Sequence, residues 1–283
     1  MEKVSLYIPC YNAQDTVREC LESVFGQTRA VDEIVVIDDG STDSSIKIAK
    51  EYPVKVIRHE KNRGLAACRN SAFEFARNEI IASLDADCAA EPEWLEELMG
   101  CIIDDETAGA GGRLRERFSV TPADKWRAVH MAQSWGEEFI KNPPFLYGSN
   151  TVFKKKAIEA AGFYNERFRA NYEDADISRR MYDKGFKLVY NPRARAEHIR
   201  RDTIHSVFET FWSWQHHYSF RQGFYGRSSS RRLAAWFGNL VKHADILEYL
   251  LHQDTREGQF GLLFLDATCF MYCVYRELKQ LPE

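Results

Sequence analysis

Several features that would place this chain in a special class are missing from its sequence. No hydrophobic run reaches the roughly 20 residues that a membrane-spanning helix needs, and the longest, at residues 261–275, is interrupted by Asp266. The first residues lack a basic region followed by a long apolar run, so we expect no signal peptide. No Asn-x-Ser/Thr sequon occurs. We therefore expect a cytoplasmic protein, and a peripheral contact with the inner face of the membrane stays open.

The cysteines and the charge balance exclude further classes. The seven cysteines are scattered and include no C-x-x-C pair, so neither a disulfide framework nor a cysteine-based zinc site is indicated. With 38 basic and 42 acidic residues, the net charge of −4 gives no overall footprint for nucleic acid. Any phosphate binding must therefore be local.

The composition is that of an ordinary globular protein, with 45% apolar and 28% charged residues in a chain of 283. Over the first hundred residues, short β-branched runs alternate with helical patterns, which is typical of βαβ units around a mostly parallel sheet. After His198 there is no strand signal. We predict an α/β domain over residues 1–200, with helices flanking the sheet, and a helical C-terminal extension over 201–283.

The individual elements follow from hydrophobic periodicity and capping signals. Four strands and four helices are predicted first, at Val4–Ile8, Asp15–Gln27, Glu33–Asp38, Ser44–Glu51, Val54–Arg58, Leu65–Arg77, Ile80–Leu84 and Glu93–Ile103. A glycine-rich strand near 108–114, a helix near Ala123–Phe139 and a strand near 146–153 follow, the strands as antiparallel additions. Helices at Lys155–Ala161 and Ala175–Lys184, a strand at Lys187–Tyr190, and three helices within 202–283 complete the pattern.

Carboxylates stand where two of the predicted strands end, which is where open α/β sheets bind ligands. Asp39 follows the second strand, and a carboxylate there can accept the imide N–H of uracil or thymine; a polar turn is the alternative. Asp85 and Asp87 follow the fourth strand and point to one side of an extended chain. Two such charges raise each other's pKa unless a divalent cation lies between them. An exposed acidic turn is the alternative reading.

A third acidic group opens a predicted helix. Glu173 and Asp174 stand at its first turn, where ordinary capping and a general base are both open. His198 ends a short strand 24 residues after Asp174, either as a metal ligand or as a core histidine.

Taken together, the ordered runs IPCYNAQDTVRECLESVFGQT, DEIVVIDDGSTD, NRGLAACRNSAFEFA, SLDADC, YGSNTVFKKKAIEAAGFYNERF and NYEDADISRRMYDKGFKLVYNPRARAEH resemble the family 2 glycosyltransferases of GT-A fold. The resemblance covers about residues 3–200. It implies a nucleotide-sugar donor, a divalent cation and inversion at the anomeric carbon, in the synthesis of a cell-surface glycan or polysaccharide. A metal site made of the carboxylate oxygens of Asp85 and Asp87 and a nitrogen of His198 would favour Mn²⁺ over Mg²⁺.

The resemblance also implies residue roles, carried over position by position. Pro9, Tyr11, Asn12 and Asp39 match positions that hold the nucleoside, and Arg63 and Arg69 are the only basic candidates for the diphosphate in the first hundred residues. Asp87 matches the direct metal ligand, Asp85 a partner of the ribose or metal, and His198 a histidine that completes the metal site in some members. Asp174 matches the general base, with Glu173 orienting it or the acceptor.

Two other functions remain open at this point: an inactive relative that only binds nucleotide sugars, and a sugar-1-phosphate nucleotidyltransferase. The second would need a glycine-rich phosphate loop after the first strand, where this chain has Pro9-Cys10-Tyr11-Asn12. The sequence does not choose between UDP and dTDP, and it names neither the sugar nor the acceptor, a glycan or a lipid-linked glycan.

The C-terminal extension begins with a basic, aromatic segment. Residues 199–235 carry six arginines (Arg200, Arg201, Arg221, Arg227, Arg231 and Arg232) against two acids (Asp202 and Glu209), a local net charge of +4, with eight aromatic residues between them. This pattern fits either an acceptor or lipid-headgroup surface or a helical subdomain that packs its aromatic side chains. A homodimer contact through the extension also stays open.

Overall fold

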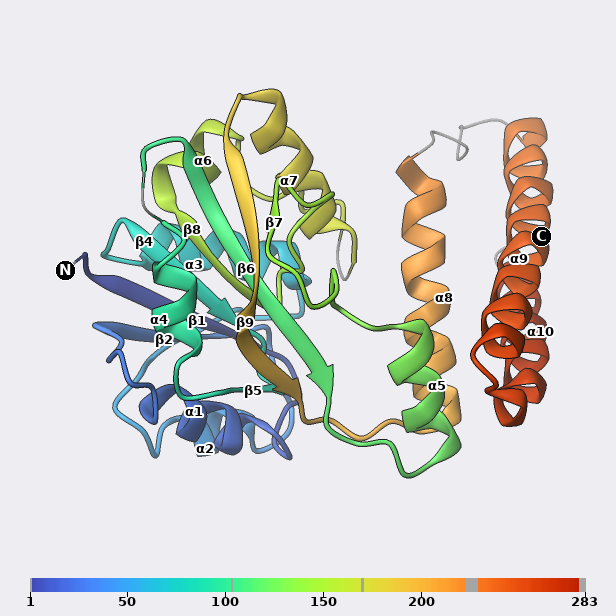
Figure 1. The fold of residues 1–283 in the computed structure, drawn as a ribbon, viewed down its shortest axis with the longest axis horizontal. Helices are drawn as coiled ribbons and strands as arrows, with labels where there is room; N and C mark the ends of the chain where they lie inside the picture. The colour runs from blue at the N-terminus through green and yellow to red at the C-terminus, as the bar shows by residue number, and fades with distance from the viewer. Residues whose placement is uncertain (1, 103, 169–170, 222–228, 280–283) are drawn as a thin grey trace. The chain divides into compact units, whose positions relative to one another are not determined.

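The computed structural model describes residues 2–102, 104–168, 171–221 and 229–279, with side chains described outside 216–237, 239 and 240 (Figure 1). The chain divides into two compact units. Unit 1 comprises residues 1–117 and 133–200, and unit 2 comprises 118–132 and 201–283. Unit 2 thus includes a segment from the middle of the chain as well as the C-terminal extension.

Unit 1 begins with the four parallel strands that the sequence predicts. They are β1 (Val4–Cys10), β2 (Glu33–Asp38), β3 (Lys55–Arg58) and β4 (Ile80–Leu84), in the spatial order β3-β2-β1-β4. The helices between them are α1 (Val17–Phe25), α2 (Ser45–Ala49) and α3 (Leu65–Phe75). All four carboxyl ends therefore meet at one edge, where residues 38–39 and 85–87 follow directly.

Alternate side chains of each strand point to opposite faces of the sheet, and each face is covered by its own hydrophobic core. In β1, Leu6 and Ile8 lie in the cluster that contains Leu21 of α1, whereas Tyr7 lies in the cluster that contains Phe73 of α3. Successive side chains of a strand point to opposite faces, so a strand covered on both faces is apolar throughout.

The second part of unit 1 extends the sheet with strands of both directions. The elements are β5 (Cys88–Ala90), α4 (Trp94–Met99), β6 (Thr107–Glu116), β7 (Ile140–Lys141), β8 (Asn150–Lys154), α6 (Lys155–Ala160), α7 (Glu173–Asp183) and β9 (Lys187–His198). β8 is antiparallel to β4 and β6, and β5 is antiparallel to β9. β6 and β9 run parallel, side by side in Figure 1. The predicted fold class is thereby confirmed, as a mixed sheet.

Two predicted elements differ most in extent from the observed ones. The helix expected near Ala123–Phe139 is α5, which spans only Pro122–His130. Gly136 has φ +101° and Trp135 donates its indole N–H to Phe145 O at 2.8 Å, so this stretch packs on a neighbouring loop instead. The strand expected at Lys187–Tyr190 continues to His198 as β9, because β6 pairs with it beyond a bulge.

Unit 2 is helical. It contains α5, α8 (Ile204–Arg221), α9 (Ser229–Arg256), a short 3₁₀ turn (Phe260–Leu262) and α10 (Leu263–Leu278). Its core includes Trp126, Phe208, Phe211 and Trp212. Of the aromatic residues in the basic segment 199–235, Phe208, Phe211 and Trp212 therefore belong to this core. The side chains of Arg227, Arg231 and Arg232 lie outside the described residues. In the described part of the chain, no helix has the length and hydrophobicity to cross a membrane.

Candidate active site

The Asp85-Ala86-Asp87 segment forms a turn between β4 and β5. Asp85 donates its backbone N–H to Ser149 O at 3.1 Å and accepts from Cys88 N at 2.9 Å, which fixes the turn at the carboxyl edge of the sheet. Because β5 pairs with β9, Cys88 stands opposite His198, and Ile199 N donates to Asp87 O at 2.8 Å. The strand pairing thus brings together Asp87 and His198, two of the three residues predicted for the metal site.

Asp87, His198 and Glu116 form a chain of three contacting side chains. His198 Nε2 lies 3.1 Å from Asp87 Oδ2, and His198 Nδ1 lies 2.7 Å from Glu116 Oε2. His198 is 3% exposed. Both ring nitrogens face a carboxylate; with a metal bound, the Glu116 carboxylate would hold the proton on Nδ1 and leave Nε2 as the ligand atom, the usual arrangement behind a metal-binding histidine. Glu116 was not among the residues singled out from the sequence.

Asp85 turns toward Arg69 instead of His198. Its Oδ1 lies 3.5 Å from Arg69 Nη2, and among the described residues this oxygen has no hydrogen bond. Burial raises the pKa of Asp85 to about 6, against the opposing charge of Arg69 and with the added effect of Asp87. Asp87 and His198 are in contact, and Asp85 would have to turn away from Arg69 to join them; carboxylate and imidazole donors are the chemistry that suits a divalent transition-metal ion.

Arg69 is the buried centre of the site, only 1% exposed. Its Nη1 donates to Tyr7 Oη at 3.1 Å, Ser83 Oγ at 3.0 Å and Gly148 O at 2.8 Å. Its Nε donates to Glu173 Oε1 at 3.3 Å. One guanidinium therefore connects the Asp85 turn to the acidic start of α7. That Arg69 also contacts a nucleotide sugar stays a prediction.

Gly148 explains how closely the backbone approaches this guanidinium. A Cβ at position 148 would lie 2.5 Å from Arg69 Nη2. The glycine of the Tyr-Gly-Ser-Asn run is thus required by packing against a charged group, and its N–H also donates to Asp174 Oδ2 at 3.2 Å.

Glu173 and Asp174 occupy the first turn of α7 after Tyr172, whose φ of 76° is left-handed. Glu173 is 2% exposed and holds Arg69, whereas Asp174 is half-buried and accepts from Gly148 N and from Ala175 N at 2.7 Å. Burial, with the charge of Asp174, raises the pKa of Glu173 to about 7, and burial raises the pKa of Asp174. Asp174 is therefore the more accessible carboxylate of the pair, with a basicity above that of a free aspartate.

The four predicted nucleoside contacts lie at the carboxyl ends of β1 and β2. Pro9 pairs with Ile37 within the sheet. Tyr11 is 51% exposed, an aromatic face open to solvent. Asn12 accepts from Thr42 N at 2.9 Å through its side chain, which ties the two strand ends together.

Asp39 lies deeper than the sequence indicates. It is 3% exposed and accepts from Arg63 N and Gly64 N, both at 2.8 Å. Its Oδ1 is 2.7 Å from His59 Nδ1, and His59 Nε2 is 2.9 Å from Ser71 Oγ. Asp39 thus organises the loop after β3. The sequence contained no local signal for His59 or Ser71, because they meet Asp39 only through the fold.

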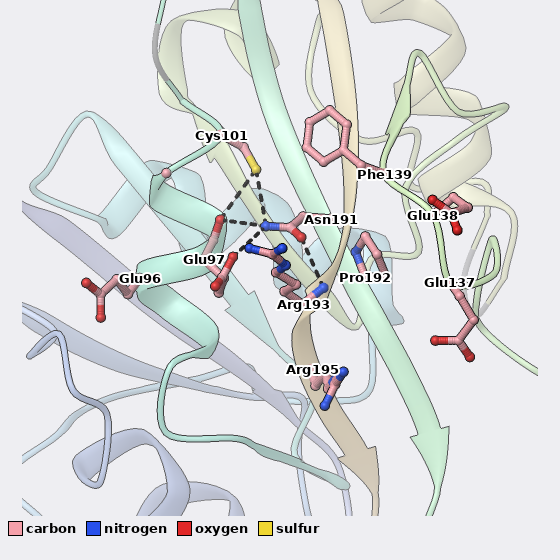
Figure 2. Close-up of a pocket in the computed structure, with 11 residues that line it drawn as sticks. Glu96, Glu97, Cys101, Glu137, Glu138, Phe139, Asn191, Pro192, Arg193 and Arg195 are labelled. Atoms are coloured by element: carbon pink, nitrogen blue, oxygen red, sulfur yellow. Dashed lines mark hydrogen bonds between the residues drawn. The ribbon is translucent and has the colours of Figure 1, made fainter.

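A cavity of about 680 Å³ lies elsewhere in unit 1 (Figure 2). It is bounded by α4 and the bulged part of β9, where Asn191 donates to Glu97 O at 3.1 Å and Arg193 and Arg195 follow. None of the residues that line it in the described chain is a predicted site residue. The cavity is therefore separate from the strand edge where the predicted site residues lie.

Comparison with known proteins identifies the class. Residues 5–164 match the model of "Glycosyl transferase family 2", and the chain belongs to this family, as its motifs predicted. The uncharacterized glycosyltransferase YibD of Escherichia coli (strain K12) is 41% identical over 148 residues, 51% of this chain and 43% of YibD. The putative glycosyltransferase EpsE of Bacillus subtilis (strain 168) is 28% identical over 71% of this chain and 74% of EpsE.

Solved structures show the same fold. The mannosyltransferase PcManGT from Pyrobaculum calidifontis, in complex with GDP-Man and Mn²⁺, matches with a TM-score of 0.64 at 17% identity, over 98% of this chain and 87% of that one. GalNAc-T7 with UDP, GalNAc and Mn²⁺ matches with a TM-score of 0.58 at 22% identity, over 71% and 44%. The chain thus spans less than half the length of YibD and of GalNAc-T7.

Proposed function

We propose that this protein transfers a sugar from a nucleotide diphosphate to an acceptor hydroxyl, with inversion at the anomeric carbon. The observation that carries the proposal is the shared Arg69. This one guanidinium lies between Asp85 of the cation turn and Glu173, next to Asp174. Through Arg69, the proposed cation turn is connected to the start of α7, which carries the proposed base.

The reaction follows from the placement of these groups. Asp174 removes the proton of the acceptor hydroxyl while its oxygen attacks the anomeric carbon from the face opposite the diphosphate. Bond formation and departure of the nucleoside diphosphate occur in one displacement, so the configuration inverts. Glu173 holds Arg69, and hydrogen bonds from Gly148 N and Ala175 N hold Asp174. When bound, a divalent cation at Asp85, Asp87 and His198 supplies Lewis-acid neutralisation of the leaving group.

Mn²⁺ is the proposed cation. The imidazole nitrogen of His198 beside two carboxylates suits a transition metal better than Mg²⁺, which prefers oxygen ligands. The same ion is present in the structures of PcManGT and GalNAc-T7.

The proposed donor carries uracil or thymine. Four groups already surround the Asp39 carboxylate: the backbone N–H groups of Arg63 and Gly64, the ring of His59 and the thiol of Cys68. The support for a pyrimidine is the place of Asp39 at the carboxyl end of β2, and Tyr11 offers an exposed aromatic surface at the end of β1. The proposed acceptor is a glycan or a lipid-linked glycan.

Calorimetric titration of UDP, dTDP and GDP, each with and without Mn²⁺, tests this proposal. We expect UDP or dTDP to bind with Mn²⁺ and to lose most of their affinity in Asp87→Ala. Tighter binding of GDP than of both others would contradict the pyrimidine assignment alone. If Mn²⁺ left the binding of all three unchanged, the metal-assisted mechanism would be wrong. If the protein bound the nucleotide but never transferred the sugar from a nucleotide-sugar donor, it would instead be an inactive relative.

A further inference from the structure

A second group of ionisable side chains lies inside unit 2, where three helices end or begin. His130 is the last residue of α5, Asp254 lies in the last turn of α9, and Asp266 lies in the first turn of α10. All three side chains are 0% exposed. His130 Nε2 is 3.2 Å from Asp254 Oδ1 and 3.4 Å from Asp266 Oδ1.

Most polar atoms of this cluster lack a hydrogen bond to any described residue. They are both ring nitrogens of His130, both carboxylate oxygens of Asp254, and Oδ2 of Asp266. Asp266 Oδ1 accepts from Trp126 Nε1 at 2.8 Å. Of these five atoms, His130 Nε2 and Asp254 Oδ1 face each other as an ion pair, and the other three form no hydrogen bond with the described residues. Buried polar atoms are nearly always paired with protein, water or an ion, so the cluster has room for a further partner.

The charge at this point is also unbalanced. Two carboxylates face one imidazole, so the buried charge is negative even when His130 is protonated. Asp254 additionally lies at the carboxyl end of α9, where the helix dipole disfavours a negative charge. A divalent cation would neutralise both carboxylates at once.

The separations between the atoms fit a metal centre. Bonds of 2.0–2.2 Å in a tetrahedral site place ligand atoms about 3.3–3.5 Å apart, close to the 3.2 and 3.4 Å observed from His130 Nε2. The three ligand atoms lie within 4.8 Å of one another. Trp126 donates to Asp266 Oδ1, as outer partners of metal-bound carboxylates do.

We propose that His130, Asp254 and Asp266 bind one Zn²⁺ ion, which joins α5, α9 and α10. This site is separate from the donor cation at Asp85 and Asp87, since all of its residues belong to unit 2. One nitrogen and two oxygen ligands are within the donor set of Zn²⁺, and a fourth position would hold water. The ion would stabilise unit 2 and take no part in glycosyl transfer.

The experiment uses the full chain carrying Asp87→Ala, so that the donor cation site does not contribute. After EDTA treatment, Zn²⁺ is added, excess metal is removed, and the bound metal is measured by mass spectrometry. We expect about one Zn²⁺ per chain, and Zn²⁺ at 100 times its Kd should raise the unfolding temperature by roughly 5 °C. Co²⁺ in the same site should give visible absorption bands.

Adding Asp254→Asn should abolish Zn²⁺ binding and the thermal shift, while adding Asp245→Asn, an exposed position of the same helix, should change neither. Asparagine keeps the shape of the side chain and removes a buried charge, and circular dichroism checks that the helices are intact. Should Asp254→Asn not fold, His130→Gln replaces it in the comparison. Absence of Zn²⁺ from the Asp87→Ala chain, or its equal retention after Asp254→Asn and Asp245→Asn, would overturn the proposal.

Discussion

Glu116 shows how one side chain can control a site without touching the reacting groups. Its carboxylate lies 2.7 Å from His198 Nδ1, on the side of the ring away from Asp87. By fixing the proton on Nδ1, it keeps Nε2 available and orients the ring. The cation affinity of the site should therefore depend on Glu116 although Glu116 is not a proposed ligand.

Glu116→Gln is expected to weaken Mn²⁺ binding by roughly 10- to 100-fold, the usual effect of removing the outer partner of a metal-bound histidine. The measurement is a Mn²⁺ titration followed by electron paramagnetic resonance in the presence of nucleotide. Glu106→Gln, an exposed glutamate just before the same strand, is the control. Equal Mn²⁺ affinity in the two variants would show that His198 is oriented by other groups.

Glu173 should make stability depend on pH. Its pKa in the folded protein is raised from 4.5 to about 7, so folding favours its protonated form. This contribution is fully present below pH 4.5 and is lost as the pH rises through about 7. Relative to Glu173→Gln, the wild-type free energy of unfolding should therefore fall between about pH 5 and pH 8, as measured by urea denaturation. A constant difference between the two proteins across this range would contradict the raised pKa.

Among individual residues, the sequence predicts those that are marked by their neighbours in the chain. Asp85 with Asp87, and Glu173 with Asp174, are neighbours in the chain and stand at the end of a strand or the start of a helix. Glu116 and His198 are 82 residues apart, and their contact depends on the register of β6 against β9. A single sequence contains no pattern that fixes such a register.

Among the elements, β6 shows how packing dictates sequence. A Cβ at Gly112 would lie 2.0 Å from Ala194 O of the neighbouring strand and 2.6 Å from Asn150 Oδ1. Any side chain would therefore separate β6 from β9 at the bulge, and these strands carry Glu116 and His198. The glycine-rich composition, which reads as a weak strand signal in the sequence, is a requirement of close strand contact.

Gly112→Ala is accordingly expected to destabilise unit 1 by about 3 kcal/mol or more, within the range of severe overpacking, and to weaken Mn²⁺ binding. Thermal and chemical denaturation would measure the loss. Gly238→Ala, in the middle of α9 with nothing within 4 Å of the new Cβ, should be neutral or stabilising by up to about 1 kcal/mol. Similar stability changes in both variants would refute the explanation for Gly112.

The elements of the first hundred residues could be predicted because each has its own hydrophobic periodicity and its own capping or turn residues. The stretch after α5 could not. Its aromatic residues continue a helical pattern, but Trp135 packs edge-to-face on Phe145 with ring centroids 5.1 Å apart. Contacts with a loop ten residues away decide the conformation there, and local propensity does not report them.

For the whole molecule, the division into two units has a consequence for shortened chains. Trp126 of unit 2 is fully buried, edge-to-face against Phe208 and Phe211 at 5.4 and 5.1 Å between ring centroids. The sequence predicts that the catalytic domain ends at residue 200, and this boundary stays a prediction. For folding, residues 118–132 share a core with residues beyond 201.

A chain that ends at Arg201 should therefore aggregate, because α5 would expose Trp126. Replacing residues 118–132 in that chain by a short Gly/Ser linker should restore a monomer. Such a linker is short enough because Leu114 N donates to Gln133 O at 3.2 Å, so the two ends are close. Size-exclusion chromatography distinguishes the two chains. Equal behaviour as monomers would show that α5 does not need the C-terminal helices.

The most direct test of the proposed mechanism is the rate of sugar transfer by Asp174→Asn. The amide keeps the hydrogen bond from Gly148 but cannot take the acceptor proton, so nucleotide affinity should stay within about twofold while release of nucleoside diphosphate from the donor falls at least about 100-fold. Asp183→Asn, an exposed position of the same helix, should retain the wild-type rate. An Asp174→Asn enzyme with more than about a tenth of the wild-type rate would contradict the assignment of Asp174 as the general base.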